Sequence, residues 1–105
     1  MINRDLCELF IMKILEKTIS NDYVWDKGQN PSSFILKEPT FSLRIYKEEN
    51  GEYILFVTYD KDSPTVELDT SYFKELYECI SRLFNYVYNS FPNFNKFLVD
   101  YLEFK

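Results

Sequence analysis

Histidine and alanine are absent from this 105-residue chain, which also has only two glycines and two cysteines. Without imidazole, the chain lacks the usual general base, the usual metal ligand and the Ser-His-Asp and Cys-His arrangements. Two glycines cannot build a phosphate-binding loop, and the sequence contains no GxGxxG, Walker or GxSxG motif. We therefore expect a protein that is not an enzyme, with carboxylate-only catalysis as the alternative.

The two cysteines, Cys7 and Cys79, are far apart in the sequence and form no CxxC pair. Their spacing does not fit a zinc site or a redox motif. Each falls within a helical apolar pattern, so we expect buried, reduced thiols, while a bridge between two helices stays open as the alternative. We expect no metal and no cofactor.

The N-terminal region has no long uncharged apolar run, because charged residues interrupt every hydrophobic stretch there. We expect neither a signal peptide nor a membrane span, no contact with a membrane, and a cytoplasmic location in a host cell. Ile, Asn, Lys, Tyr and Phe are abundant. In a chain without alanine, this composition indicates an AT-rich genome, such as that of a low-GC bacterium, its phage or another virus.

The formal net charge is −5, with 17 acidic and 12 basic residues. A negative chain repels the phosphates of DNA and RNA, so direct nucleic-acid binding is not expected. An anionic surface can instead occupy the basic groove of a protein partner, or it can simply keep the protein soluble.

The hydrophobic pattern predicts one α+β domain over residues 1–105. Apolar residues at helical spacing predict helices over residues 3–19, from Asp69 as N-cap to the break at 90–93, and over a short C-terminal segment. Extended patterns predict strands at 33–37, 40–46 and 52–59. The expected fold is an N-terminal helix, a small three-stranded antiparallel sheet and two C-terminal helices packed on one face.

The middle of the chain contains the clearest hairpin signal. In residues 40–46, apolar side chains alternate with Ser42, Arg44 and Tyr46, which is the period of a half-buried strand. Asn50-Gly51 can adopt the positive φ of a tight turn. The following run at 52–59 is almost continuously apolar and indicates a strand in the interior of the sheet.

The first helix has a wider apolar surface than one packing contact needs. Leu6, Phe10 and Ile14 follow four-residue steps, but Leu9 and Met12 lie outside that stripe. A second packing partner would explain them, and it could be another element of this fold or another subunit. A homodimer therefore stays open.

Acidic residues form two groups in the sequence. Glu48, Glu49 and Glu52 surround the predicted turn, and the second group, at the far end of the strand, comprises Asp60, Asp62, Glu67 and Asp69. The strand between them spans roughly 26 Å at about 3.3 Å per residue, so the groups could engage two basic points on a partner. Ordinary hydrophilic loops are the alternative.

A calcium loop beginning at Asp60 is not expected. The EF-hand pattern fails at Pro64, Thr65 and Ser71, where Asp or Asn, Gly and Glu are required. Asp60 and Asp62 then act as solvated loop residues.

Nine tyrosines exceed what a core of this size needs. Tyr72 and Tyr86 lie off the apolar stripe of the second helix, so we expect both outside. Exposed tyrosine beside acids makes a good protein-binding surface. Alternatively, these rings cover the edges of the core with their hydroxyls in water.

The order of segments resembles a known family. An N-terminal helix (INRDLCELF), then NDYVW, a hairpin turning at EENGEYIL, an acidic loop and a C-terminal helical pair are similar to small acidic phage anti-CRISPR proteins that inhibit Cas9. The resemblance implies an anionic protein that blocks the DNA-binding groove of a nuclease without chemistry. The residues that match the family's acidic turn are Glu48, Glu49 and Glu52.

We therefore expect a non-enzymatic binding protein, an inhibitor from a phage or mobile element that blocks a host defence complex of the CRISPR nuclease type by mimicking nucleic-acid charge. Its expected partner-binding residues are Glu48, Glu49, Glu52, Asp60, Asp62, Glu67, Tyr72 and Tyr86. A toxin-neutralising immunity protein is the alternative, because such a protein would also be acidic and would also lack catalytic groups. A dimer that sequesters a small ligand such as a nucleotide is a further alternative.

Overall fold

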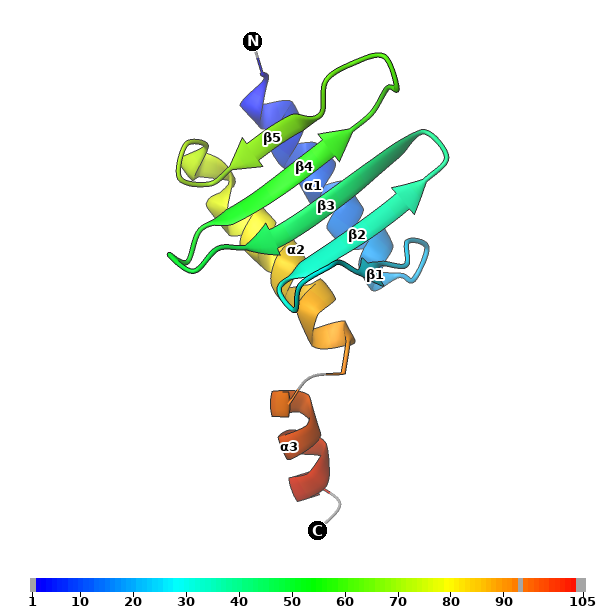
Figure 1. Ribbon diagram of the computed structural model, residues 1–105, viewed down its shortest axis with the longest axis vertical. Helices are drawn as coiled ribbons and strands as arrows, with labels where there is room; N and C mark the ends of the chain where they lie inside the picture. The colour runs from blue at the N-terminus through cyan, green and yellow to red at the C-terminus, as the bar shows by residue number, and fades with distance from the viewer. Residues whose placement is uncertain (1, 93, 104–105) are drawn as a thin grey trace.

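Five antiparallel strands form one sheet, and two helices cover one of its faces (Figure 1). The computed structural model describes residues 2–92 and 94–103. The elements, in chain order, are α1 (Arg4–Ile19), β1 (Asp26–Lys27), β2 (Ser33–Glu38), β3 (Phe41–Lys47), β4 (Tyr53–Thr58), β5 (Val66–Asp69), the short 3-10 helix η1 (Lys74–Leu76), α2 (Tyr77–Ser90) and α3 (Phe94–Glu103).

The predicted first helix is confirmed, and its start has a side-chain cap. Asn3 has extended backbone geometry, and its Oδ1 accepts a hydrogen bond from the Leu6 N–H at 3.0 Å. This bond satisfies one of the amide groups that a helix start leaves without an intrahelical partner. Ile11 and Ile14 then point into the core.

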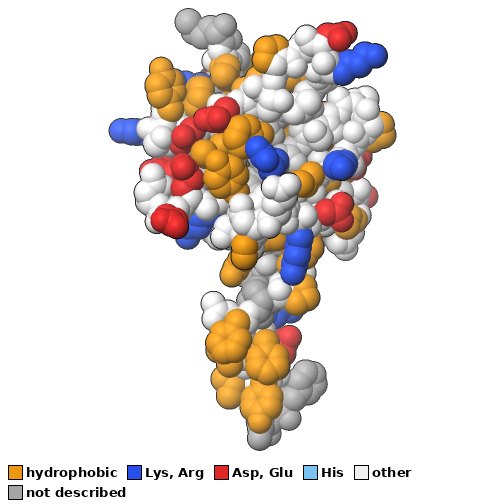
Figure 2. Space-filling view, viewed as in Figure 1, with side chains coloured by type: hydrophobic (Ala, Val, Ile, Leu, Met, Phe, Trp, Pro, Cys, Tyr) orange, Lys and Arg blue, Asp and Glu red, His pale blue; other side chains and the backbone are white. Residues whose placement is uncertain are grey.

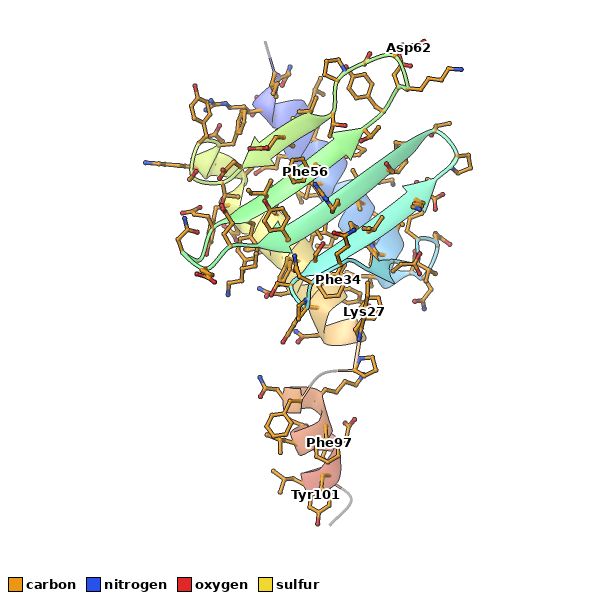
Figure 3. All side chains as sticks on the ribbon, in the orientation of Figure 1. Lys27, Phe34, Phe56, Asp62, Phe97 and Tyr101 are labelled. Carbon is orange, nitrogen blue, oxygen red and sulfur yellow. The ribbon has the colours of Figure 1, made fainter. Side chains whose placement is uncertain are left out.

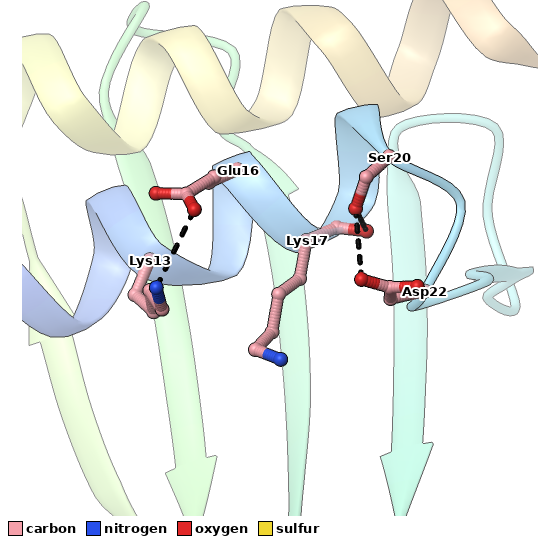
Figure 4. A network of polar contacts seen from close by, with 5 residues as sticks. All are labelled: Lys13, Glu16, Lys17, Ser20 and Asp22. Atoms are coloured by element: carbon pink, nitrogen blue, oxygen red, sulfur yellow. Dashed lines mark hydrogen bonds and ion pairs between the residues drawn. The ribbon is translucent and has the colours of Figure 1, made fainter.

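The end of α1 is closed by a small polar network (Figure 4). The Ser20 hydroxyl lies 3.2 Å from the Lys17 carbonyl oxygen and 3.0 Å from Asp22 Oδ2. Asn21 follows with a φ of 65°, a left-handed conformation that asparagine tolerates better than most residues. The chain therefore leaves the helix sharply and turns back toward the sheet.

The sheet is a meander in which each strand pairs with the next, in the order β1-β2-β3-β4-β5. Between β3 and β4 the Glu48 N–H donates to the Glu52 carbonyl at 2.8 Å, and Gly51 has a φ of 87°. The predicted turn at Asn50-Gly51 is thus confirmed. The predicted interior position of the apolar run is also confirmed, because β4 has a partner strand on each side.

The prediction of a three-stranded sheet is wrong, because the sheet has five strands. β1 contains only two residues, too few for a periodic signal. β5 covers Val66–Asp69, which the sequence pattern assigned to a loop and a helix start. Asp69 is accordingly not the N-cap of the second helix. Its carboxylate accepts from the Ser71 N–H at 2.9 Å in a local turn, and α2 begins at Tyr77.

The core lies between the sheet and the two covering helices. Inward-facing side chains of the strands meet one stripe of each helix, and the Phe34 ring contacts the Phe84 ring edge-on at 5.7 Å. The fully buried members include Ile11, Leu36, Leu43, Ile45, Leu55, Leu68, Leu76, Ile80, Leu83 and Val87. This layer leaves the opposite face of the sheet uncovered by helices (Figure 1).

The last helix does not pack on the sheet, so the expectation that both C-terminal helices do so is wrong for α3. None of its residues is buried, and it stands apart from the rest of the chain (Figure 1). Phe91 ends α2 with extended geometry, φ −98° and ψ 150°. Pro92 follows and cannot continue a helical hydrogen-bond ladder. Both residues therefore direct the chain away from the body.

Candidate functional site: the open face of the sheet

Alternate side chains of β2 to β5 point away from the helices and form a continuous surface, which we call the open sheet face. Strand register places Ile35, Arg44, Phe56 and Glu67 side by side in one row across four strands. A second row contains Tyr46, Ile54 and Asp69. The open sheet face thus consists of Ile35, Arg44, Tyr46, Ile54, Phe56, Glu67 and Asp69.

An aromatic pair lies at the centre of this face. The rings of Tyr46 and Phe56 stack with centroids 5.9 Å apart and planes 22° apart. The Arg44 guanidinium also lies over the Phe56 ring, with its carbon 4.5 Å from the ring centroid. Figure 3 shows Phe56 in the middle of the sheet, on the side facing the viewer. Stacked, half-buried rings of this kind offer contact area at little cost in side-chain entropy.

The charges of three carboxylates, those of Glu48, Glu67 and Asp69, act on the Tyr46 hydroxyl, and we call these three residues the acidic cluster. Burial raises the pKa of Tyr46 above its ordinary value, and the negative charges of Glu48 and Glu67 raise it further. Asp69 acts in the same direction, whereas Arg44 lowers the pKa. The hydroxyl therefore stays protonated and can donate a hydrogen bond, and the carboxylates around it favour a cationic group on a partner.

The space-filling view shows the same arrangement. In Figure 2 an apolar patch occupies the centre of the sheet, acidic side chains lie together on one side of it, and basic side chains are scattered around the rest. An apolar centre with charges at its edge is the usual anatomy of a protein–protein interface.

The structure regroups the acids that the sequence suggested. β5 runs antiparallel to β4, and Asp69 is the direct partner of Ile54 at the start of β4. Asp69 therefore returns to the end of the sheet that carries Glu48, and Glu67 lies opposite Phe56 in the middle of the sheet, so neither stays with the β4–β5 loop. The expected second acidic group is split for this reason.

The remaining acids at the β3–β4 turn have different environments. Glu49 is exposed at the tip of the turn. Glu52 is half-buried and accepts a hydrogen bond from the Thr70 hydroxyl. Thr70 in turn accepts from the Tyr53 N–H at 2.9 Å. Glu52 thus ties the turn to the end of β5, and its carboxylate is already engaged within the fold.

Asp60 and Asp62 lie in the β4–β5 loop. Figure 3 shows Asp62 at the end of the sheet opposite the β3–β4 turn. Asp60 accepts from the Asp62 N–H at 3.1 Å and from the Ser63 hydroxyl at 3.3 Å. These bonds make a local turn. The loop does not bring either aspartate to the open sheet face.

Tyr72 and Tyr86 are on the outside, as predicted, but neither belongs to the open sheet face. Tyr72 is 74 % exposed and packs edge-on against Phe73 with centroids 5.4 Å apart. Tyr86 is 40 % exposed on α2 and lines a hollow together with Trp25. The predicted residues therefore occupy four separate regions of the surface: the sheet with its β3–β4 turn, the β4–β5 loop, the surroundings of Phe73 and the hollow beside Trp25.

Residues with metal-binding or thiol chemistry form no further site in the part of the chain that the structure describes. Over residues 2–92 and 94–103, no group of three or more Cys, Asp or Glu side chains is placed to hold a metal ion. Cys7 and Cys79 are both free. Among the same residues, no helix combines the length and the apolar character needed to cross a lipid bilayer.

Comparison with known proteins gives no relative: the chain matches no family model, no curated protein and no solved structure. Its function must therefore be inferred from the chemistry of its surface.

Proposed function

We propose that this protein is a non-enzymatic binding protein, and that its open sheet face holds a protein partner with a basic surface. One observation carries the proposal: the stacked Tyr46–Phe56 pair lies beside three carboxylates on a sheet face that no helix covers. The rings supply an apolar centre to the interface, and the carboxylates select a cationic neighbour.

The kind of partner follows from charge. A net charge of −5 disfavours direct contact with nucleic acid, yet it favours a protein groove that itself binds nucleic acid. Glu48 belongs both to the acidic cluster and to the turn that resembles phage anti-CRISPR proteins. We therefore propose an inhibitor, encoded by a phage or mobile element, that occupies the DNA-binding groove of a host defence nuclease.

The test is a titration of the purified protein against an RNA-guided nuclease loaded with its guide, with target DNA as competitor. We expect inhibition of DNA cleavage and an affinity that falls as salt rises, because the contact is between opposite charges. The variant Phe56→Ala removes the aromatic centre, and Glu67→Lys reverses one charge of the cluster. Each is expected to weaken binding by at least about tenfold.

Glu38→Lys is the matched control, because it makes the same charge change at the far end of β2. It should leave the affinity nearly unchanged. A nuclease that cleaves normally in the presence of excess protein overturns the nuclease proposal. Binding that survives both Phe56→Ala and Glu67→Lys overturns the assignment of the open sheet face.

A further inference from the structure

A pocket with a volume of about 410 Å³ lies where α2 ends, between that helix and the loop that joins β1 to β2. Pockets that hold small molecules usually measure about 300–1,000 Å³. One wall is formed by residues 27–31, and the other carries the rings of Phe34, Tyr88 and Phe91. Figure 3 shows Lys27 and Phe34 together at this end of the sheet. We call this feature the Lys27 pocket.

Strand register places the lysine on the side of the sheet that the helices cover. Lys27 is the direct partner of Phe34 across β1 and β2, and the Phe34 ring contacts Phe84 of α2. Asp26 is the partner of Ile35, which belongs to the open sheet face. Because neighbouring side chains of a strand point to opposite faces, the carboxylate of Asp26 is separated from the ammonium group of Lys27. The described residues that line the Lys27 pocket include no Asp or Glu.

The aromatic wall of the Lys27 pocket is held in place by contacts within the core. The rings of Phe34 and Phe91 stack with centroids 5.1 Å apart, and the Tyr88 ring meets Phe34 edge-on at 6.2 Å. Phe34 is only 2 % exposed, whereas Tyr88 and Phe91 are half-buried. Lys27 Nζ lies 6.0 Å from the Phe91 centroid. A planar group can therefore stack against fixed rings with an ammonium group beside it.

The loop wall is ordered by its own hydrogen bonds. The Gly28 N–H donates to the Ser33 carbonyl at 2.7 Å, and the Ser32 N–H donates to Asn30 Oδ1 at 3.1 Å. A Cβ at Gly28 would overlap the Ser33 side chain, so this close approach requires glycine. The side chains of Gln29 and Asn30 both line the pocket, and their amide groups can donate hydrogen bonds to an anion.

The charge in the Lys27 pocket differs in sign from the net charge of the chain. The chain carries −5, yet the charged residue that lines the pocket is Lys27. Solvent screens exposed charges from one another beyond about 8 Å at physiological ionic strength. A small ligand in the pocket therefore responds mainly to Lys27, whereas a long nucleic-acid chain would also meet the acidic residues of the surrounding surface.

We propose that the Lys27 pocket binds a small planar molecule that carries an anionic group, with its ring against Phe91 and its anion at Lys27 Nζ. The carboxylate of an aromatic acid and the phosphate of a mononucleotide both supply this chemistry. The pocket lies on the helix-covered side of the sheet, so the inference does not depend on the function proposed for the open sheet face. A bound ligand connects the β1–β2 loop to the end of α2 and thereby stabilises the fold.

The test is an NMR titration of the isotope-labelled full chain with naphthoate and with adenosine monophosphate. Naphthamide and adenosine are the neutral analogues, and acetate and inorganic phosphate are the anions without a ring. We expect saturable shifts of the amide signals of residues 27–34 and 87–91, with a Kd below about 1 mM for at least one of the two aromatic anions. Its neutral analogue should bind at least about tenfold more weakly. The aromatic anion with the lower Kd identifies the source of the ligand.

Two variants separate the charge from the rings. Lys27→Met keeps an apolar stem of similar length and removes the charge, so it should weaken binding of the aromatic anion at least about tenfold and leave the neutral analogue nearly unchanged. Phe91→Leu keeps an apolar side chain and removes the ring, so it should weaken binding of both compounds. Lys37→Met is the matched control, because Lys37 is exposed near the other end of β2 and should leave both affinities unchanged.

Lys27 is exposed, so Lys27→Met should retain the fold, and the amide spectrum of the variant checks this directly. The absence of saturable shifts with both aromatic anions overturns the proposal. So does equally tight binding of the neutral analogue or of the anion without a ring, since the latter would be the contact of an ion with one surface lysine only. Shifts centred on Arg44 and Phe56 would place the ligand on the open sheet face and also overturn it. An affinity for the aromatic anion that Lys27→Met leaves unchanged has the same consequence.

Discussion

The guanidinium of Arg44 lies over the ring of Phe56, 4.5 Å from its centroid, and the two residues are direct partners across β3 and β4. The contact holds the positive charge flat against the sheet, while Tyr46 stacks on the same ring at a centroid distance of 5.9 Å. Arg44 remains exposed at its edge. The face therefore offers a partner both an anchored cation and, next to it, an acidic cluster.

Replacement of Phe56 by alanine should cost only about 1–2 kcal/mol in the free energy of unfolding, because the ring is half-buried and its contacts lie on an open face. Replacement of Phe34 by alanine should cost about 3–5 kcal/mol, because that ring is buried against Phe84 and Phe91. Urea unfolding of both variants measures the difference. Equal costs would contradict the assignment of the two rings to opposite faces of the sheet.

Thr18→Val should destabilise the fold by about 1–3 kcal/mol. The buried Thr18 hydroxyl accepts a hydrogen bond from Trp25 Nε1 at 3.0 Å and donates to the Ile14 carbonyl at 2.7 Å. Valine fills the same space but leaves the indole N–H buried without an acceptor. Trp25 is the only tryptophan, so thermal unfolding followed by its fluorescence reports directly on this site. Thr40→Val, at an exposed position, is the control and should change little.

Alkaline pH should lower stability through Cys79. Burial raises the pKa of this thiol from 9.0 to about 11. In the unfolded chain the thiol ionises from about pH 9, whereas in the folded protein it stays neutral until about pH 11. The unfolded state thus binds fewer protons in this window, and the free energy of unfolding falls as pH rises.

Urea unfolding of the native chain and of Cys79→Ala at several pH values between 9 and 11 measures this effect. In the variant, the free energy of unfolding should fall less steeply as pH rises. The decrease that remains includes a contribution from Tyr46, whose pKa is also raised. Identical slopes in the two proteins would show that Cys79 does not control the pH dependence.

Asn3→Ala should destabilise α1 by about 1 kcal/mol, since it removes the acceptor for the Leu6 N–H. Asn3→Asp keeps an acceptor at the same place and adds a favourable charge at the helix start, so it should be neutral or slightly stabilising. Melting temperatures of the three proteins make the comparison. A loss of stability in Asn3→Asp as large as that in Asn3→Ala would contradict the capping role.

Much of the fold was predictable in segments where apolar side chains recur with one clear period. The alternation in residues 40–46 placed Arg44 and Tyr46 on one side of β3, which is the side of the open sheet face. Phe56 could not be assigned in the same way, because β4 has apolar residues on both of its faces and shows no alternation. The aromatic pair depends on strand register, which the sequence of one strand does not specify.

The errors also have physical causes. β5 has only four residues, and two of them, Glu67 and Asp69, are acidic. The segment therefore shows too short an apolar alternation to predict a strand. Leu6 continued the four-residue steps of α1, yet it is exposed, because the sheet and α2 contact a different stripe of the helix that includes Ile11 and Ile14. For α3, helical spacing gave the element correctly but carried no information about whether its apolar face is covered.

Both outer strands of the sheet are poor templates for polymerisation. β1 consists of only two charged residues, Asp26 and Lys27, and β5 is four residues long with Pro64 just before it. Strands this short cannot easily recruit a further strand from another molecule. The protein should therefore resist fibril formation through β1 and β5, and a macromolecule that recognises the centre of the sheet must read its side chains and not extend the backbone ladder of these two strands.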